Sequence, residues 1–234
     1  MKKIGLVMVA IALAIPVAAH PFPWNHDDSV SITLRQWVTS GLGSYGGLFE
    51  LTNTTINETI YGFCVELDEY VINPGLVYTG NTDLAVWGGR NTTDSGDPLS
   101  GPSKWLYYHY LHGHPGLQDV QALQVAIWLL EDEYLASEDW PNQTKWLKWY
   151  TDHGGDPSVG NQALFYYNMA FSNGQNFEND YIHVLNIYRT VNNQEIQGQS
   201  YIYGVKVPEP MTVSLLGLGL VAVGVAARRI KKRA

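Results

Sequence analysis

The sequence predicts an α+β fold: an antiparallel β-sandwich or barrel with a helical insert, plus one C-terminal transmembrane helix. Strand-like patterns come first, helical patterns occupy the middle, and strand-like patterns return near residue 181. Strands and helices do not alternate, which argues against a wound parallel sheet. The chain also contains 8 Trp and 15 Tyr among 234 residues. This aromatic content indicates a packed core rather than a disordered chain.

Four strands are predicted in the first part of the chain. Alternating polar and apolar residues, or a high content of β-branched and aromatic residues, place them at 29–39, 48–55, 58–67 and 76–79. The glycine-rich residues 41–47 predict a hairpin turn between the first two strands. The sequence Asn73-Pro74-Gly75 predicts a turn before the fourth strand.

The middle of the chain is predicted to be helical after a loop at 91–102. Helices are expected at 103–111, from 120 to about 134, at 142–150 and at 161–171. Ser103 and Asp119 are the expected N-caps of the first two helices, because short polar side chains accept hydrogen bonds from free N–H groups there. Strand-like alternation then returns at 181–191 and 200–207.

The N-terminus predicts an export signal. Lys2 and Lys3 precede an apolar stretch, and Val17-Ala18-Ala19 offers a small-residue cleavage site. We therefore expect a signal peptide at residues 1–19 and an exported domain at 20–206.

The C-terminus has three parts. Pro208-Glu209-Pro210 is followed by an apolar run at 211–227, which is near the lower length limit for a membrane span. A basic tail at 228–233 follows, and such clusters stay on the cytoplasmic side. Residues 207–234 resemble the PEP-CTERM sorting signal of Gram-negative bacteria. The resemblance implies export, transient anchoring in the inner membrane, and processing by an exosortase.

The charge of the chain is divided between its ends and its middle. Residues 20–210 carry seven Lys or Arg and all 22 Asp or Glu, for a formal net charge of −15. Such a surface repels nucleic acid and anionic lipid. The composition therefore argues against a nucleic-acid-binding protein and suits a matrix protein or one with basic partners.

Cys64 is the only cysteine, so no intrachain disulfide can form. It lies in Tyr61-Gly62-Phe63-Cys64-Val65-Glu66-Leu67, and Leu123-Gln124-Val125-Ala126-Ile127-Trp128 follows sixty residues later. This pair of motifs resembles the internal thioester domains of bacterial surface proteins. The resemblance implies that the Cys64 sulfur condenses with the Gln124 carboxamide and that ammonia leaves.

A thioester needs a carboxamide held against the sulfur, a polarised carbonyl and a site that excludes water. We expect the apolar surround from Phe63, Val65, Ile127 and Trp128, with Ala126 beside them. Free N–H groups in the first turn of the helix that carries Gln124 are expected to polarise the carbonyl. Gln118 and Gln121 are weaker alternatives to Gln124, because neither precedes Ile-Trp at the same spacing.

Other side-chain groups leave alternatives open. A metal site is one interpretation of His109, His112 and His114, and a solvated loop is the other. The acids Glu131, Asp132, Glu133, Glu138 and Asp139 predict a solvated helix end, with calcium as the alternative. Glu66, Asp68 and Glu69 suggest, weakly, a glycosidase. Sugar stacking is an alternative to core packing for Trp140, Trp146, Trp149 and Tyr150.

The sequence leads to one functional expectation and one rival. We expect an exported cell-surface or biofilm-matrix protein whose Cys64–Gln124 thioester captures amines covalently, for adhesion or crosslinking. It would need no cofactor and no metal, and would not be an enzyme, because capture occurs once. Its partners would be the exosortase, amine-bearing molecules and exopolysaccharide. The rival is a non-covalent exopolysaccharide-associated or carbohydrate-binding matrix protein without a thioester.

Overall fold

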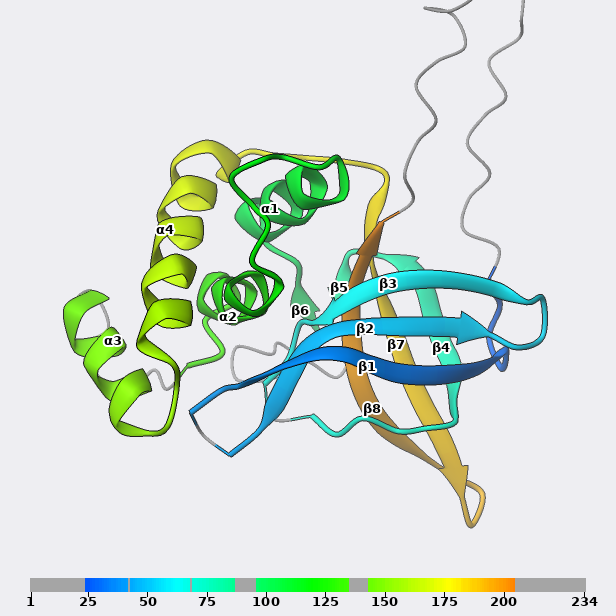
Figure 1. Ribbon diagram of the computed structural model, residues 1–234. Coiled ribbons are helices and arrows are strands. Elements are labelled where there is room, and N and C mark those ends of the chain that lie inside the picture. Colours follow the sequence, from blue (N-terminus) through cyan, green and yellow to red (C-terminus); the bar gives the residue numbers. More distant parts are fainter. Residues whose placement is uncertain (1–23, 42, 68, 87–95, 135–142, 205–234) are drawn as a thin grey trace, which may run out of the picture. The chain divides into compact units, whose positions relative to one another are not determined.

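The computed structural model describes residues 24–41, 43–67, 69–86, 96–134 and 143–204. All of them belong to one compact unit, Pro21–Lys206. Figure 1 shows a curved sheet with a group of helices packed at one end of it. The order of elements is strands, helices, strands, so the α+β class with a helical insert is confirmed.

The main sheet is antiparallel and contains six strands in the order β1-β2-β3-β8-β7-β4. Their bounds are β1 Ser29–Thr39, β2 Tyr45–Asn53, β3 Glu58–Cys64, β4 Gly75–Thr82, β7 Ile182–Val191 and β8 Gln194–Gly204. The N-terminal end of β4 pairs back to β1 through two residue pairs, Ser29 with Leu76 and Val30 with Gly75. This joint is short, so the sheet is a curved antiparallel sheet that meets itself at one corner rather than a fully closed barrel.

The first hairpin differs from its prediction. β2 begins at Tyr45, so Gly46 and Gly47 belong to the strand and not to the turn. An irregularity in β1 between Leu34 and Gln36 lets the two strands stay paired through these glycines. Two short strands, β5 Leu84–Ala85 and β6 Asp97–Pro98, form a separate two-stranded sheet.

Among the described residues between β6 and β7 there are four helices. They are α1 Gly101–Leu111, α2 Val120–Leu130, α3 Gln143–Asp152 and α4 Pro157–Gly174. Asp119 caps α2 as predicted, by accepting from the N–H groups of Gln121 and Ala122. The cap of α1 is Ser100 and not Ser103, because the helix begins two residues earlier than predicted.

Helix α2 is the centre of the fold. It contacts α4 on one side and strands β1, β2 and β3 on the other. Its residues from Ala122 to Trp128 are all buried. A helix that is apolar on all sides is expected between two packed layers, and this position brings Gln124 close to the sheet.

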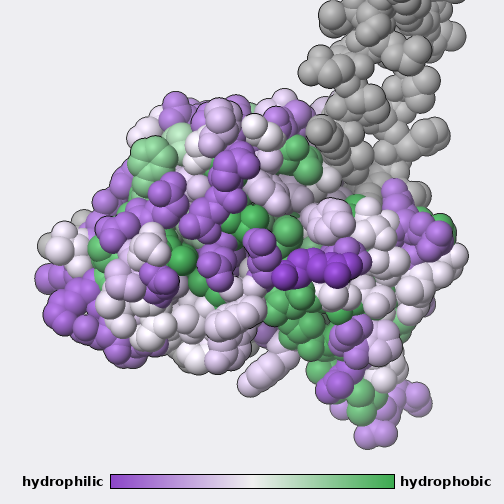
Figure 2. Space-filling view, viewed as in Figure 1, coloured by the Kyte–Doolittle hydropathy of each residue, from purple (hydrophilic) through white to green (hydrophobic). Residues whose placement is uncertain are grey.

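The core joins the sheet to the helices, and its largest fully buried side chains are mostly aromatic. Phe63 of β3 meets Tyr107 and Tyr110 of α1, with ring centroids 6.0 and 5.5 Å apart in edge-on arrangements. On the face of the molecule in Figure 2, hydrophilic residues and residues of intermediate hydropathy cover most of the surface, and apolar residues occupy smaller areas.

Within the described residues, no helix is long and apolar enough to cross a membrane. The predicted span at 211–227, the signal peptide and the basic tail lie outside the described residues.

Candidate functional site

The structure brings Cys64 and Gln124 together. Cys64 is the last residue of β3, and Gln124 lies in the second turn of α2. The Gln124 Nε2 donates to the Cys64 carbonyl oxygen at 2.8 Å, and the Cys64 N–H donates to Gln124 Oε1 at 2.9 Å. One carboxamide is thus held by both main-chain groups of a residue sixty positions earlier. Both residues are buried, Cys64 to 1% exposure and Gln124 to none.

The Gln124 carboxamide lies where the hydrogen-bond ladder between β2 and β3 ends. Pairing between β2 and β3 ends at Leu48 and Phe63, so the next residues, Gly47 and Cys64, have no ladder bond with each other. The Gln124 Oε1 also accepts from the Gly47 N–H at 3.0 Å. The carboxamide therefore bonds to main-chain groups on both strands where their ladder stops.

A glycine makes the close approach possible. A Cβ at Gly46 would lie 2.4 Å from Trp128 Cζ2 and 3.2 Å from the Gln124 Cδ. A contact of 2.4 Å is far inside van der Waals distance, so only glycine lets β2 pass directly over the indole and the carboxamide. The Gly46-Gly47 pair is the sequence signal for this contact, but in a glycine-rich stretch the same pair also indicates a turn.

The two N–H groups on Gln124 Oε1 are arranged as donors that would stabilise charge on that oxygen. Their distances, 3.0 and 2.9 Å, are those of a preorganised oxyanion site. They come from the strands. The prediction that the first turn of α2 supplies these donors is wrong, because Asp119 uses the N–H groups of Gln121 and Ala122 there.

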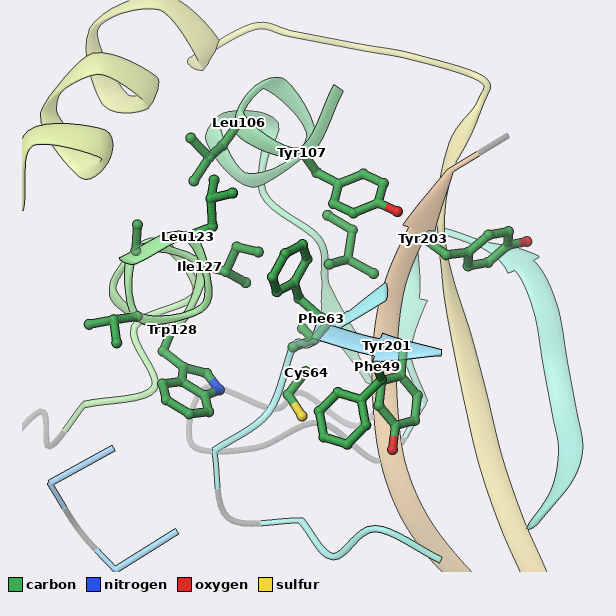
Figure 3. Close-up of a cluster of buried hydrophobic side chains, with 14 of the residues drawn as sticks. Phe49, Phe63, Cys64, Leu106, Tyr107, Leu123, Ile127, Trp128, Tyr201 and Tyr203 are labelled. Carbon is green, nitrogen blue, oxygen red and sulfur yellow. The ribbon is translucent and has the colours of Figure 1, made fainter. Parts of the chain in front are cut away.

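The surround of the pair is apolar and closed. Phe63, Val65, Ile127 and Trp128 are each exposed by 1% or less. Figure 3 shows the Cys64 sulfur directed toward the rings of Phe49 and Tyr201, with the Trp128 indole on the other side. Tyr201 is the register partner of Cys64 on β8. Such a site excludes water from the sulfur and the carboxamide.

Burial sets the protonation of the thiol. It raises the pKa of Cys64 well above its usual value, and the negative charge of Glu69 adds to the effect. The resting thiol is therefore neutral, unlike the low-pKa thiolates of ordinary nucleophilic cysteines. The pKa of Tyr201 is raised in the same way, by burial and then by Cys64.

The alternative glutamines have other partners. Gln118 donates to the carbonyl of His114, and Gln121 donates to the carbonyl of Trp37. Gln124 is the one of the three whose amide bonds to Cys64.

The three histidines do not converge on one point. His112 Nδ1 bonds to the carbonyl of Tyr108, and His114 Nδ1 accepts from the Gly116 N–H. In the described part of the chain, the group whose side chains could share a metal ion consists of acids instead: Glu66, Asp97 and Glu133.

The interpretation of residues 131–133 as a solvated helix end is wrong for two of them. Glu131 and Glu133 are buried, at 6% and 0% exposure. Glu131 accepts from the Ser100 hydroxyl at 2.6 Å, and Glu133 accepts from the Leu67 N–H at 3.0 Å. Acid runs after a helix are usually exposed, and the sequence holds no sign of these partners. Asp68, Glu138 and Asp139 lie outside the described residues.

Of the four aromatic residues considered for sugar stacking, Trp146 and Tyr150 are packed in the core. Trp146 and Tyr150 are buried and stack on each other at 5.1 Å. Trp149 is partly buried against the core. Trp140 lies outside the described residues.

Comparison with known proteins identifies the tail. Residues 206–232 match the PEP-CTERM protein-sorting motif. No curated protein and no solved structure matched the chain. The motif means that the protein is exported, anchored in the membrane before processing, and sorted by an exosortase.

Proposed function

We propose that this exported protein carries an internal thioester between Cys64 and Gln124, with which it captures amines covalently on the cell surface or in the matrix. The observation that supports it best is the seating of the Gln124 carboxamide on the main chain of Cys64 in a buried site. Cys64 and Gln124 are far apart in sequence, yet two hydrogen bonds join them directly, and the condensation depends on such a close approach.

The chemistry has two steps. In the first, the Cys64 sulfur attacks the Gln124 Cδ, the thiol proton passes to the leaving nitrogen, and ammonia departs. The N–H groups of Gly47 and Cys64 stabilise the negative charge that develops on Oε1. In the second, an incoming amine attacks Cδ, an amide forms, and Cys64 regains its thiol. Each chain reacts once, so the protein is a covalent binder and not an enzyme.

The Cys64 sulfur lies beside the ring of Phe49 (Figure 3). Attack requires the sulfur to approach the Gln124 Cδ to about 3–3.5 Å. Rotation about the Cα–Cβ bond of Cys64 moves the sulfur while the main-chain hydrogen bonds stay in place.

The closed surround favours a lasting thioester over a hydrolysed one. Water is excluded by buried side chains on both the strand and the helix. The bond would also be a structural crosslink. By analogy with a disulfide that closes a loop of this length, it would contribute about 4 kcal/mol through the unfolded state.

The charge of the exported domain suits amine partners. A net charge of −15 over residues 20–210 attracts Lys-rich or polyamine molecules and repels nucleic acid. After exosortase processing we place the protein on the cell surface or in the biofilm matrix, where adhesion or crosslinking through such amines would occur, in association with exopolysaccharide. No cofactor is required.

Methylamine tests this function directly. The protein is incubated with methylamine, digested and mapped by mass spectrometry. We expect methylamine on Gln124 and a newly titratable thiol on Cys64. Gln121→Ala is the matched control and should react as the wild type does, whereas Cys64→Ala should not react. Methylamine absent from Gln124 in the folded wild-type protein would contradict the proposal.

A second candidate is non-covalent carbohydrate binding, favoured by one surface observation. Trp37 and Tyr45 lie edge-on at 5.5 Å on neighbouring strands, and 58% and 62% of them are exposed. Exposed aromatic pairs are suited to stacking on sugar rings. Binding to a glycan array that persists in Cys64→Ala and is lost in Trp37→Ala would favour this function instead.

A further inference from the structure

Three acidic side chains meet in the interior close to Cys64. Glu66 follows β3, Asp97 lies in β6, and Glu133 follows α2. A carboxylate oxygen of each lies within 4.8 Å of the other two. Figure 1 shows β6 beside the end of β3 that faces α2. Glu66 and Glu133 have no exposed surface, and Asp97 is 8% exposed. We call these three residues the acidic cluster.

Within the described residues, the acidic cluster has few compensating groups. Both carboxylate oxygens of Glu66 and the Asp97 Oδ2 are buried without a hydrogen-bond partner. The ion pairs found in the same part of the chain involve neither residue, and Lys104 pairs with Asp83 and Glu178 instead. A buried carboxylate without a donor is costly, and its charge needs a counter-charge or a proton.

The cluster itself disfavours ionisation. Burial first, then the charges of Glu133, Glu69 and Asp97, raise the pKa of Glu66 to about 10. Burial and Asp132 raise the pKa of Asp97 as well. The buried Glu66 and Asp97 oxygens without a donor in the described segments are the reason to look for a counter-charge in this cluster.

The geometry points to a divalent cation, Ca²⁺, bound between Glu66, Asp97 and Glu133. All three ligands are oxygens, which hard cations prefer and Zn²⁺ sites with His or Cys do not resemble. Oxygens on one Ca²⁺ at 2.3–2.6 Å lie up to about 5 Å apart, which agrees with the 4.8 Å limit here. Mg²⁺ fits less well, because it keeps several waters and is rarely held by a buried all-protein cage.

The ion would join three segments that the chain brings together from far apart. It would fix the end of β3 to β6 and to the segment after α2. The Glu66 carbonyl already accepts from Gln199 Nε2 at 2.8 Å and from Trp128 Nε1 at 3.4 Å. A cation at the Glu66 side chain would therefore immobilise the segment two residues beyond Cys64. Extracellular calcium sites have Kd values of about 10⁻⁴–10⁻³ M, which suits an exported protein.

The test uses Ca²⁺ alone as the probe. The protein is stripped with EDTA, dialysed, and titrated with CaCl2 by calorimetry, and its thermal unfolding is followed with and without the ion. We expect one ion per chain and a rise in Tm of about 5–10 °C at a hundredfold excess over Kd. The measurement is repeated in Cys64→Ala, so that the result does not depend on the thioester.

Variants locate the ion. Glu66→Gln and Asp97→Asn should each abolish the rise in Tm. If Glu66→Gln does not fold, Asp97→Asn, at the edge of the cluster, still tests the site. Glu195→Gln, an exposed acid on the β7–β8 hairpin, is the matched control and should retain the full response. An equal Tm in EDTA and in Ca²⁺, or a response that survives in both cluster variants, would overturn the proposal.

Discussion

Two polar sites lie two residues apart at the end of β3, and their environments are opposite. At Cys64 the Gln124 carboxamide forms three hydrogen bonds with main-chain groups. At Glu66 both carboxylate oxygens lack a partner among the described residues. A buried polar group that is satisfied holds its neighbours in place, whereas one that is not satisfied is costly unless a proton or a counter-charge compensates it. The first site therefore fixes the position of a carboxamide, and the second is the site at which we propose that a cation binds.

The largest loss of stability is expected when the hydrogen-bonded carboxamide of Gln124 is removed. Gln124→Ala leaves the Gly47 N–H and both main-chain groups of Cys64 buried without partners. Each such group costs about 1–3 kcal/mol, so the free energy of unfolding should fall by about 4 kcal/mol or more, and further if the thioester is lost. Urea unfolding measures it. Gln121→Ala should change the free energy of unfolding by less than about 1 kcal/mol. An equal loss in both variants would contradict the role assigned to the Gln124 carboxamide.

Because Glu66 is buried without a hydrogen-bond partner in the described part of the chain, we expect the stability of the EDTA-treated protein to depend on pH. The pKa of Glu66 is raised from 4.5 to about 10, so between these values the folded state binds more protons than the unfolded state. Its contribution to stability is therefore present below pH 4.5 and is lost as pH rises toward 10. We expect a loss of about 1 kcal/mol per pH unit between pH 5 and 8.

Glu66→Gln should make the free energy of unfolding nearly independent of pH in this range. Ca²⁺ should restore to the wild-type protein the stability that it loses at pH 8. Urea unfolding at four pH values, with and without the ion, is sufficient. Stability that rises with pH in the metal-free protein would show that Glu66 is compensated by another group.

Adding a methyl group at Gly46, beside the Gln124 carboxamide, should lower the stability by less than Gln124→Ala does. In Gly46→Ala the added methyl group would overlap the Trp128 indole, so the strand or the indole must move. Such overpacking costs about 1–3 kcal/mol, and it should also slow the reaction with methylamine. Gly116→Ala, whose neighbour is the His114 ring at the surface, is the control. Unchanged stability and reactivity in Gly46→Ala would mean that β2 does not press on the carboxamide.

The smallest effect is expected at a buried acid that does have partners. Glu131 accepts from the Ser100 hydroxyl, and burial still raises the pKa of Glu131 to about 7. Ser100 also caps α1. Ser100→Ala should therefore cost about 1–2 kcal/mol and raise the pKa of Glu131 further. Titration of Glu131 by NMR measures this shift, and an unchanged pKa would contradict the assigned hydrogen bond.

Most of the fold can be predicted because the local patterns agree with it. The alternation of residues 29–39 predicts β1 at its observed bounds, and Asp119 is both the predicted and the observed cap of α2. The predictions fail where tertiary contacts decide. Gly46 and Gly47 have turn-like chemistry but lie in a strand. A Cβ would overlap the Trp128 indole at Gly46 and the Gln36 carbonyl at Gly47. Glu133 follows a helix in an acidic run, yet it is buried because it accepts from the Leu67 N–H.

The two candidate sites also differ in how well the sequence predicts them. Two sequence motifs at a particular spacing indicate Cys64 and Gln124 as a pair. The acidic cluster has no sequence signal, since Glu66, Asp97 and Glu133 are spread over three segments with no common spacing.

The intact mass of the purified protein shows whether the Cys64 sulfur and the Gln124 carboxamide have become one thioester. We predict a mass lower than the sequence mass of the processed chain by one ammonia, with the deficit absent from Cys64→Ala and from Gln124→Ala. A wild-type mass equal to the full sequence mass, in protein that is folded and has not met an amine, would contradict it.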